Sequence, residues 1–498
     1  MHKKPRNALW WGTLTLTGAA LASRGLGLIY RMLLARFLGS EGLGFFQMIF
    51  PLYVALVTLS VAGTPVAVSQ ILAEGKAPAR HLMRVATAVV LATSLPLVFL
   101  VAVGRRPLAL VLYHDPRFEP WLLVLAPALV AVALSSVIRG YFIGRQDLRY
   151  PAASQVLEQL VRVLIVFWLL DRVHPLGAAY APLIAVGLIP LGELVSLGLL
   201  AYGYWQTKPP PAPTPAPPKL ARTVLRLSLP VTASRLMASL FGVIEASLIP
   251  ERLVHSGLSP ADAVSYFGQL TGMALPLILF PTALTVSLST NLIPAIAAAL
   301  HDRPRVHQYI VDAMKATALL TIPVTFVLLS LGLPLDDLLF HATVPQAVFL
   351  PLVVGGFFLY FDIALAGVLR GLGRTDIPLW NDLFASGFEI LLIWGWAGRP
   401  GQGYQAVAVA VAAGFIASAG LNLWHVIRLT QVRIPWFQVL GKPIVAAFPL
   451  LLVLPAWQSW AGTVWHNRAL SLLSSVVLAG LGYLVTLYVT GTRPNRLV

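Results

Sequence analysis

Two arginines, Arg24 and Arg31, lie inside the first long apolar stretch of the chain. Charged side chains are costly inside a bilayer, so those that occur there usually bind a substrate or an ion. Seven residues of helix place the two guanidinium groups on one stripe, about 10 Å apart along the axis. Gly25 and Gly27 allow another backbone to approach this helix closely. Guanidinium groups bind anionic oxygens, those of phosphates included, in a bidentate manner.

A third intramembrane arginine repeats the setting of the first. The tripeptide Ala-Ser-Arg that ends at Arg24 recurs at Arg235, in a later apolar stretch. We expect Arg24 and Arg235 to face each other across the interface of two lobes, and Arg31 to lie nearer the outer end of its helix. Two alternatives stay open: the side chains extend to the membrane surface, or they form structural ion pairs with Glu245 or Glu158.

Acidic side chains also occur within apolar stretches. Glu158 and Arg162 are spaced i, i+4 in the favourable order, which predicts a structural ion pair. Glu245, Asp362 and Glu389 are expected in the second lobe, where they are candidates to hold Na⁺ or a proton that drives a transport cycle. Hydrogen bonding between helices is the alternative role. The acids of this kind are Glu158, Glu193, Glu245, Asp362 and Glu389.

Motifs of other chemistries are absent from the sequence. The chain has no cysteine, which excludes disulfides, thiolate catalysis and Cys-based metal sites. It has no Walker A sequence, no His-Glu-x-x-His spacing and no Gly-x-Ser-x-Gly. We therefore expect a protein that is not an enzyme and holds no metal site and no cofactor. Na⁺, H⁺ and the membrane potential are the candidates for a driving force.

Composition decides where these residues lie. Of 498 residues, 58% are hydrophobic and 11% are charged, and the mean hydropathy is +0.80. Soluble domains carry about 25% charged residues, so a soluble enzyme is excluded and an all-α integral membrane protein is predicted. A bilayer is spanned by about 20 helical residues. Fourteen spans are expected, at 9–37, 44–72, 85–104, 120–139, 152–170, 177–203, 223–250, 265–299, 313–333, 345–369, 377–397, 403–427, 441–459 and 468–489.

Positive charge indicates the orientation of these spans. The formal net charge is +16, but the basic residues are dispersed among apolar runs, which favours membrane topology over nucleic-acid binding. With the N-terminus inside, the inner loops and both tails carry 22 Lys and Arg and the outer loops 8. This bias predicts that both termini are cytoplasmic.

A proline-rich segment divides the spans into two sets. Residues 205–222 are polar and proline-rich and are expected to form an extended spacer. Residues 1–204 then form an N-lobe with the first six spans, and residues 223–430 form the core of a C-lobe with the next six. Residues 431–498 add two further spans.

The two halves repeat short motifs in the same order. Phe50-Pro51 has a counterpart in Phe280-Pro281, and Arg139-Gly140 after the fourth span has one in Arg370-Gly371 after the tenth. Because six spans separate the copies, they begin on the same side and form parallel repeats. Such repeats are typical of alternating-access transporters with a substrate site between the lobes. The alternative is that Arg-Gly loops recur through topology alone.

Prolines interrupt the second and eighth spans, which are too long for one straight crossing. We expect kinked or broken helices there. These prolines are either hinges of alternating access or static kinks whose freed backbone groups are satisfied by neighbouring Ser and Thr. The candidate hinges are Pro51, Pro65, Pro281 and Pro294.

Three segments carry a resemblance to a known family. They are Ser23-Arg24-Gly25-Leu26-Gly27, Ala62-Gly63-Thr64-Pro65 and Arg139-Gly140-Tyr141-Phe142-Ile143-Gly144. Together with the span count, they resemble the stage V sporulation protein B-like family. This family belongs to the multidrug/oligosaccharidyl-lipid/polysaccharide (MOP) exporter superfamily, which includes lipid II flippases.

The resemblance implies two pseudo-symmetric, MATE-like lobes around a central cavity in the bacterial cytoplasmic membrane. It implies a flippase for an undecaprenyl-pyrophosphate-linked saccharide, lipid II or a related cell-wall or polysaccharide precursor. Arg24, Arg31 and Arg235 would then bind the diphosphate. We expect a monomer whose partners are this lipid-linked glycan and membrane lipids. The alternatives are a multidrug or cation antiporter of the same fold, a membrane scaffold for envelope assembly, and a membrane-embedded glycan polymerase.

Overall fold

The computed structural model describes residues 6–170, 172, 181–207, 220–341 and 344–489. Every regular element within these residues is a helix. Each of the fourteen predicted spans coincides with a helix or with helices that follow one another directly, so the all-α class is confirmed. The predicted spacer falls largely on 208–219, which lie outside the described residues.

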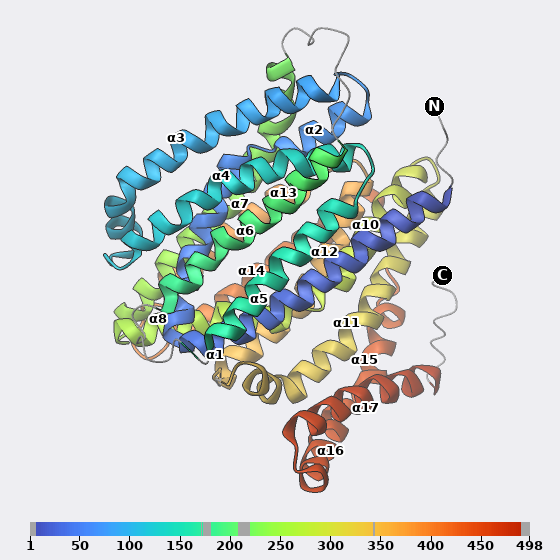
Figure 1. Ribbon diagram of the computed structural model, residues 1–498. Helices are drawn as coiled ribbons and strands as arrows, with labels where there is room; N and C mark the ends of the chain where they lie inside the picture. The colour runs from blue at the N-terminus through green and yellow to red at the C-terminus, as the bar shows by residue number, and fades with distance from the viewer. Residues whose placement is uncertain (1–5, 171, 173–180, 208–219, 342–343, 490–498) are drawn as a thin grey trace. The chain divides into compact units, whose positions relative to one another are not determined.

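The chain forms two compact units, Met1–Ser247 and Leu248–Val498. Unit 1 holds α1 (Arg6–Val61), α2 (Thr64–Ala73), α3 (Ala79–Tyr113), α4 (Phe118–Gly144), α5 (Arg149–Leu170), α6 (Ala181–Gln206) and most of α7 (Leu220–His255). Figure 1 shows α3 and α4 side by side, and α4 also packs against α6, while α1 packs against α5.

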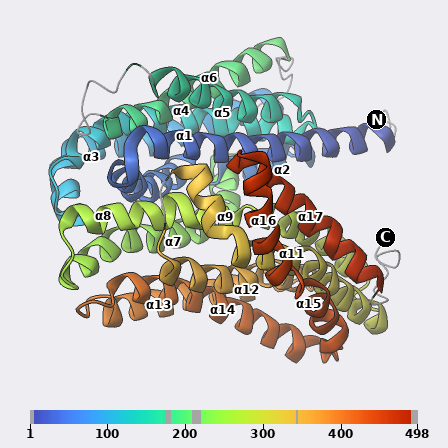
Figure 2. The ribbon, with the colours of Figure 1, turned by 90° about the horizontal axis from the view of Figure 1, so that it is seen from below.

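Unit 2 holds the remaining helices. They are α8 (Pro260–Gly268), the π-helix η2 (Gln269–Ala274), α9 (Leu275–Leu279), α10 (Thr282–Ala298), α11 (Arg303–Phe340), α12 (Gln346–Gly371), α13 (Asp376–Trp396), α14 (Gly403–Thr430), the π-helix η3 (Phe437–Gly441), α15 (Lys442–Ala447), α16 (Leu450–Trp465) and α17 (Arg468–Val489). In Figure 2, α12, α13 and α14 lie together, with α14 packed against both of the others.

The unit boundary differs from the lobe boundary expected at 205–222. The first part of α7 belongs to unit 1 because it packs tightly on the break between α1 and α2. A Cβ on Gly63 would lie 2.5 Å from the carbonyl oxygen of Ser228 and 3.0 Å from Oγ1 of Thr232. Gly63 also has φ of 63°, a left-handed conformation that favours glycine.

Among the described residues, eleven helical stretches are long and apolar enough to cross a membrane, or twelve if one bent pair is counted as a span. The first of these, Ala22–Ala73, contains two predicted spans separated at Gly39, whose φ of 66° and ψ of −178° are not helical. α13 contains the remaining predicted span. The chain is therefore a multi-pass membrane protein.

The second and eighth predicted spans are broken, as expected. In unit 1 the break lies at Ala62 and Gly63, and Pro65 occupies the first turn of α2. In unit 2 the stretches Pro260–Leu279 and Thr282–Ala298 meet at 53°, with Pro281 preceding α10. A proline fits at a helix start because its missing N–H has no helical partner there. Pro51 and Pro294 instead lie within helices that continue past them.

The repeated Arg-Gly motifs occupy equivalent places in the two units. A Cβ on Gly140 of α4 would lie 2.8 Å from the carbonyl oxygen of Pro65 in α2. A Cβ on Gly371 of α12 would lie 2.9 Å from Cβ of Ile296 in α10. In each unit, glycine thus allows the helix that follows the break to pack closely against the end of another helix.

The loops after these glycines also close on similar ion pairs. Nε of Arg149 lies 2.9 Å from Oδ1 of Asp147, and Arg374 donates to both carboxylate oxygens of Asp376 at 3.1 and 3.0 Å. The hydrogen bond from Arg374 lowers the pKa of the Asp376 carboxyl group. These pairs are solvent-exposed, so each contributes little stability and mainly fixes the loop.

We expect Gly140→Ala to lower the melting temperature of the purified protein. The added methyl group meets backbone atoms of Pro65, and overpacking of this kind costs about 1–3 kcal/mol. The matched control is Gly198→Ala in α6, where a Cβ would have no neighbour within 4 Å. Thermal unfolding in detergent tests the pair, and equal melting temperatures for the two variants would show that the α2–α4 contact does not require glycine.

Candidate functional site

Three helices of unit 2 bring polar side chains together in its interior. Asp362 comes from α12, and Asn381 and Asp382 come from α13. Ser418, Asn422 and His425 come from α14, where spacings of four and three residues place them on one face. Asp362, Asn381, Ser418 and Asn422 are buried, whereas Asp382 is exposed. The cluster therefore has a buried end and an accessible end.

Ser418 bridges the two aspartates. Its Oγ lies 2.8 Å from Oδ1 of Asp362 and 2.8 Å from Oδ1 of Asp382. A serine hydroxyl has one hydrogen to donate. Both contacts are full hydrogen bonds only when one carboxyl group carries a proton and donates it to Ser418. The geometry thus fits one proton shared among two carboxyl groups and a hydroxyl.

Amide side chains extend this bridge along α14. Nδ2 of Asn422 donates to Oδ1 of Asp362 at 2.7 Å, and Nδ2 of Asn381 donates to Oδ1 of Asn422 at 2.8 Å. The same Nδ2 of Asn381 lies 3.2 Å from Nδ1 of His425. A continuous chain of polar contacts therefore links the buried carboxyl group to a titratable imidazole.

Glu389 lies at the same helix interface, farther along α13. It is buried against Gly414 of α14, where a Cβ would come within 2.5 Å of Oε2 of Glu389. Gly414 precedes Ser418 by one helical turn. Glu389 therefore packs on the same face of α14 that carries Ser418. Glu245, by contrast, is a half-buried residue of α7 and belongs to unit 1, not to the second lobe as expected.

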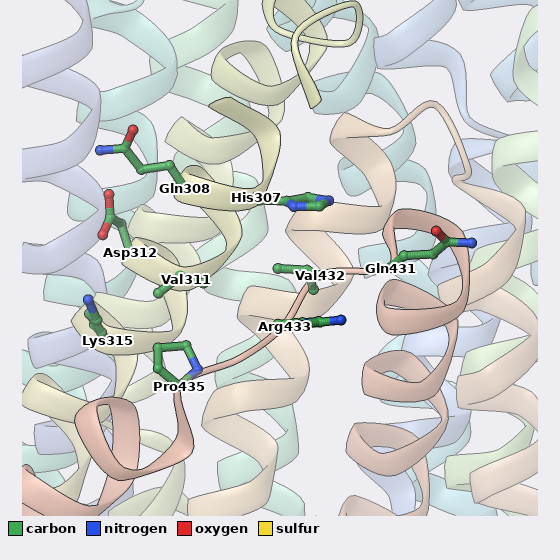
Figure 3. Close-up of a pocket in the computed structure, with 9 residues that line it drawn as sticks. All are labelled: His307, Gln308, Val311, Asp312, Lys315, Gln431, Val432, Arg433 and Pro435. Atoms are coloured by element: carbon green, nitrogen blue, oxygen red, sulfur yellow. The ribbon is translucent and has the colours of Figure 1, made fainter. Parts of the chain in front are cut away.

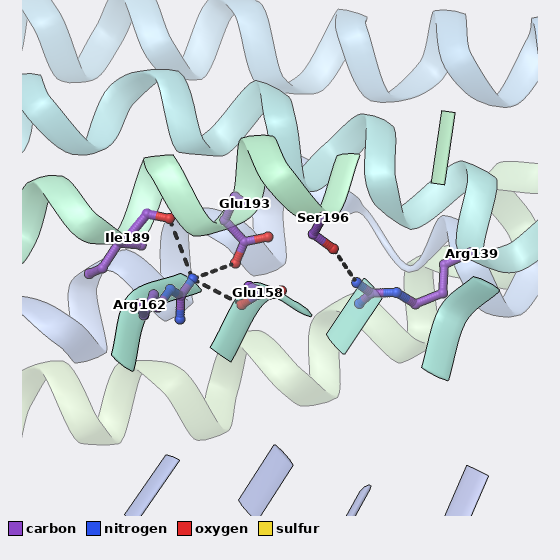
Figure 4. A network of polar contacts seen from close by, with 6 residues as sticks. All are labelled: Arg139, Glu158, Arg162, Ile189, Glu193 and Ser196. Carbon is purple, nitrogen blue, oxygen red and sulfur yellow. Dashed lines mark hydrogen bonds and ion pairs between the residues drawn. The ribbon is translucent and has the colours of Figure 1, made fainter. Parts of the chain in front are cut away.

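A second charged cluster lies inside unit 1 (Figure 4). Nη2 of Arg162 on α5 is 2.9 Å from Oε1 of Glu158, one turn earlier, and 3.3 Å from Oε1 of Glu193 on α6. All three side chains are only 11–13% exposed. Gly192 makes room for the guanidinium, because a Cβ at that position would clash with it. One guanidinium thus serves two buried carboxylates, and its ties to both helices fit the structural role predicted for Glu158 and Arg162.

Arg139 adds a second positive charge beside this cluster. Its Nη2 donates to Oγ of Ser196 on α6 at 3.4 Å, three residues beyond Glu193. The two arginines and two glutamates balance in formal charge. A balanced cluster avoids the cost of an uncompensated charge in a low-dielectric interior.

The arginines predicted to bind a diphosphate lie outside both of these clusters. Arg24 on α1 and Arg235 on α7 are exposed, and Arg31 on α1 is half-buried. Within the described part of the chain, none of the three guanidinium groups forms an ion pair. Glu158, one of the alternative partners for these arginines, is instead bonded to Arg162.

Several members of the two clusters were not singled out from the sequence. No role was predicted from the sequence for Asp382, Asn381, Ser418, Asn422 or Glu193. The available signal was the run of polar residues at helical spacing in an apolar stretch, Ser418, Asn422 and His425. Neutral residues such as Ser and Asn are not marked by charge, so only their helical spacing distinguishes them within an apolar span.

The sequence model of the family described as "Polysaccharide biosynthesis protein" matches residues 9–300. Stage V sporulation protein B of Bacillus subtilis (strain 168) is 31% identical over 439 residues, which cover 84% of this chain and 83% of that protein. Lipid II flippase MurJ of the same organism is 24% identical over 346 residues, covering 63% of this chain and 62% of that protein.

Solved structures share the fold. A structure of lipid II flippase MurJ in an inward closed conformation matches with a TM-score of 0.73 and 16% identity, covering 95% of this chain and 98% of that one. An inward-facing multidrug resistance MATE family transporter of the MOP superfamily matches with a TM-score of 0.65 and 16% identity, covering 82% and 95%. The predicted MATE-like helical fold is therefore confirmed.

We expect Arg162→Met to destabilise unit 1 strongly. Removing one partner of a buried ion pair leaves charge uncompensated and costs about 3–5 kcal/mol. The double variant Arg162→Met, Glu158→Gln leaves Arg139 and Glu193 in charge balance and should recover most of the lost melting temperature.

Arg149→Met is the matched control, because its pair with Asp147 is solvent-exposed and should change the melting temperature little. Thermal unfolding in detergent compares the variants. If the double variant is no more stable than Arg162→Met, charge compensation is not what this cluster provides.

Proposed function

Because the chain belongs to the polysaccharide biosynthesis protein family of the MOP superfamily, we propose that it is a transporter of a lipid-linked precursor. More finely, it is a flippase that moves an undecaprenyl-pyrophosphate-linked saccharide across the bacterial cytoplasmic membrane by alternating access. It acts as a monomer with both termini in the cytoplasm, and it performs no covalent chemistry on its substrate.

The observation that carries this proposal is the set of three intramembrane arginines. Arg24, Arg31 and Arg235 form no ion pair with the described residues, so their positive charge is available to a ligand. An unpaired cation in a membrane helix is costly and points to an anionic partner. A diphosphate suits guanidinium groups, which bind its oxygens in pairs. A cationic drug, the substrate of the antiporter alternative, would be repelled by the same residues.

Relatives support the class of substrate. One relative that covers most of this chain is named for sporulation, and another is named a lipid II flippase. Lipid II and other undecaprenyl-linked precursors share the diphosphate and the polyprenyl chain and differ in the glycan. We therefore propose lipid II or a related cell-wall precursor as the cargo.

Coupling is proposed at the polar cluster of unit 2. Asp362 and Asp382 share the single hydroxyl of Ser418, and the arrangement is complete when one proton is present. Arg370 on α12 acts electrostatically on both carboxyl groups, and His425 ends the chain of amides. Loss of the proton would leave two carboxylates competing for the single hydroxyl hydrogen of Ser418. A proton therefore serves as coupling ion better than Na⁺. Glu389 lies at the same contact between α13 and α14, whereas Glu245 belongs to unit 1.

The flippase proposal is tested in cells depleted of their own lipid II flippases. We expect the wild-type chain to restore outward lipid II, and Arg24→Ala or Arg235→Ala to reduce it at least about tenfold, since a charge-assisted bidentate contact is worth roughly 1.5–3 kcal/mol. Arg24→Lys keeps the charge but not the bidentate geometry and should restore activity only in part.

Arg222→Ala, an exposed arginine at the start of the same helix as Arg235, is the matched control and should retain activity. Membrane levels of every variant are measured in parallel. Full translocation by both Arg24→Ala and Arg24→Lys would contradict the diphosphate site. If the wild-type chain itself fails, the lipid II assignment is wrong, and other undecaprenyl-linked glycans are tested next.

The coupling proposal is tested in proteoliposomes with an imposed pH gradient or Na⁺ gradient. We expect translocation by the wild-type chain to follow the pH gradient, and Asp362→Asn to lose this dependence because its side chain cannot release a proton. Ser418→Ala removes the bridge and should weaken the dependence severalfold. Ser475→Ala, a buried serine of α17 bonded within its own helix, is the control. Dependence on Na⁺ instead of pH would exclude the proton site.

A further inference from the structure

A polar cavity of about 670 Å³ lies in unit 2, at the end of α14 (Figure 3). Its walls are the first turns of α11 and the segment that connects α14 to η3. Nε2 of His307 lies 2.7 Å from the carbonyl oxygen of Thr430 and ties the two walls together. This contact fixes the first turns of α11 relative to the end of α14.

Polar side chains that line this cavity lack protein partners. Lys315 and Asp312 are half-buried, Arg433 is exposed, and none of them forms an ion pair or hydrogen bond with another described residue. Other arginines at this end are engaged with aromatic rings: Arg428 lies 5.1 Å from the ring centre of Trp424, and Arg305 lies 5.9 Å from that of Tyr309. Lys315 and Arg433 are thus the cations available to a ligand, against the single negative charge of Asp312.

An apolar groove of about 160 Å³ shares two of its walls with the polar cavity, α11 and the segment that follows α14. Its walls include Met314 and Trp436, the chain neighbours of Lys315 and Pro435 in the polar cavity. Farther along, the groove is lined by Phe357 and Phe361 of α12 and by Gly420 of α14. The polar cavity and the apolar groove together form one amphipathic surface.

The level of this surface matches the edge of a bilayer. Lys315 is the last charged residue of α11 before an apolar run that reaches Leu335. Trp436 and Phe437 are exposed beside the cavity, and aromatic side chains are enriched at the level of lipid headgroups. The basic residues at this end belong to the loops predicted to be cytoplasmic, whose leaflet carries anionic lipids.

We propose that this surface binds one anionic phospholipid of the cytoplasmic leaflet. Lys315 and Arg433 attract the headgroup phosphate from the two walls of the cavity, and one acyl chain lies in the groove beside Phe357, Phe361 and Gly420. A zwitterionic lipid carries its own cation and gains less from the two basic residues, so the site selects for net negative charge. Asp312 opposes the anion and limits its affinity. This site does not depend on the flippase proposal, and it is not the site of the transported diphosphate.

The test uses the purified full-length chain and counts retained lipid by native mass spectrometry, with phosphatidylglycerol and phosphatidylcholine as probes. We expect the wild-type chain to retain phosphatidylglycerol in preference. Lys315→Gln with Arg433→Gln should weaken this retention about tenfold or more, in line with the contribution of two basic residues near an anionic headgroup. Asp312→Asn should strengthen retention severalfold, a change that loss of fold would not produce.

Two further variants separate the specific site from general surface charge. Arg428→Gln removes a neighbouring cation that is engaged with Trp424 and should leave retention unchanged. Gly420→Leu fills the groove, where a Cβ has no neighbour within 4 Å, without altering any charge, and should weaken retention of the lipid.

Three results would overturn the proposal. The first is equal retention by the double variant and the wild-type chain. The second is an equal loss in Arg428→Gln, which would indicate surface charge alone. The third is displacement of the lipid by millimolar inorganic phosphate with no effect of Gly420→Leu, which would indicate a site for free phosphate. Lipid II translocation measured on the same variants keeps this outcome separate from the flippase test.

Discussion

A polar side chain inside a membrane-embedded helix bundle must find its partner on another helix, because the bilayer core offers no water. This requirement organises the interior of both units. Arg162 on α5 binds acids on α5 and α6, and Ser418 on α14 binds acids on α12 and α13. Each cluster ties together helices that follow one another along the chain. The partners of a buried polar group therefore fix which helices are neighbours and at what depth they meet.

Close approach of helices is the second condition for these contacts, and glycine provides it. Gly192 faces the guanidinium of Arg162, and Gly414 faces the carboxylate of Glu389. Gly140 and Gly371 play the same part between backbones at the repeated Arg-Gly motifs. In lipid, association of helices relies on van der Waals contact and interhelical hydrogen bonds, and small residues permit both. The recurrence of such a glycine in the two units shows that the duplicated motif has a structural purpose at the end of a broken span.

The sequence predicted the helical class, the number of spans and the broken second and eighth spans, because hydropathy and proline act locally. It did not predict the partners of the charged residues, which depend on how separate helices pack against one another. The i, i+4 spacing placed Glu158 beside Arg162 but gave no sign that Glu193, 31 residues beyond Arg162, would join them. Composition suggested a boundary at the proline-rich segment, whereas packing of α7 on Gly63 decides to which unit that helix belongs.

The two clusters satisfy the same requirement by different chemistry, and the difference bears on what each unit does. In unit 1 a guanidinium, which keeps its charge at all accessible pH values, holds two carboxylates, so the arrangement is satisfied without a mobile ion. In unit 2 the two carboxyl groups are hydrogen-bonded to a hydroxyl and an amide, and Arg370 acts on them electrostatically without forming an ion pair within the described part of the chain. A buried carboxylate without an ion-pair partner is stabilised by a proton or a cation from outside the protein. A fixed ion pair thus suits a lobe that keeps its packing, and a cluster without an ion pair of its own suits one that changes state when an ion arrives or leaves.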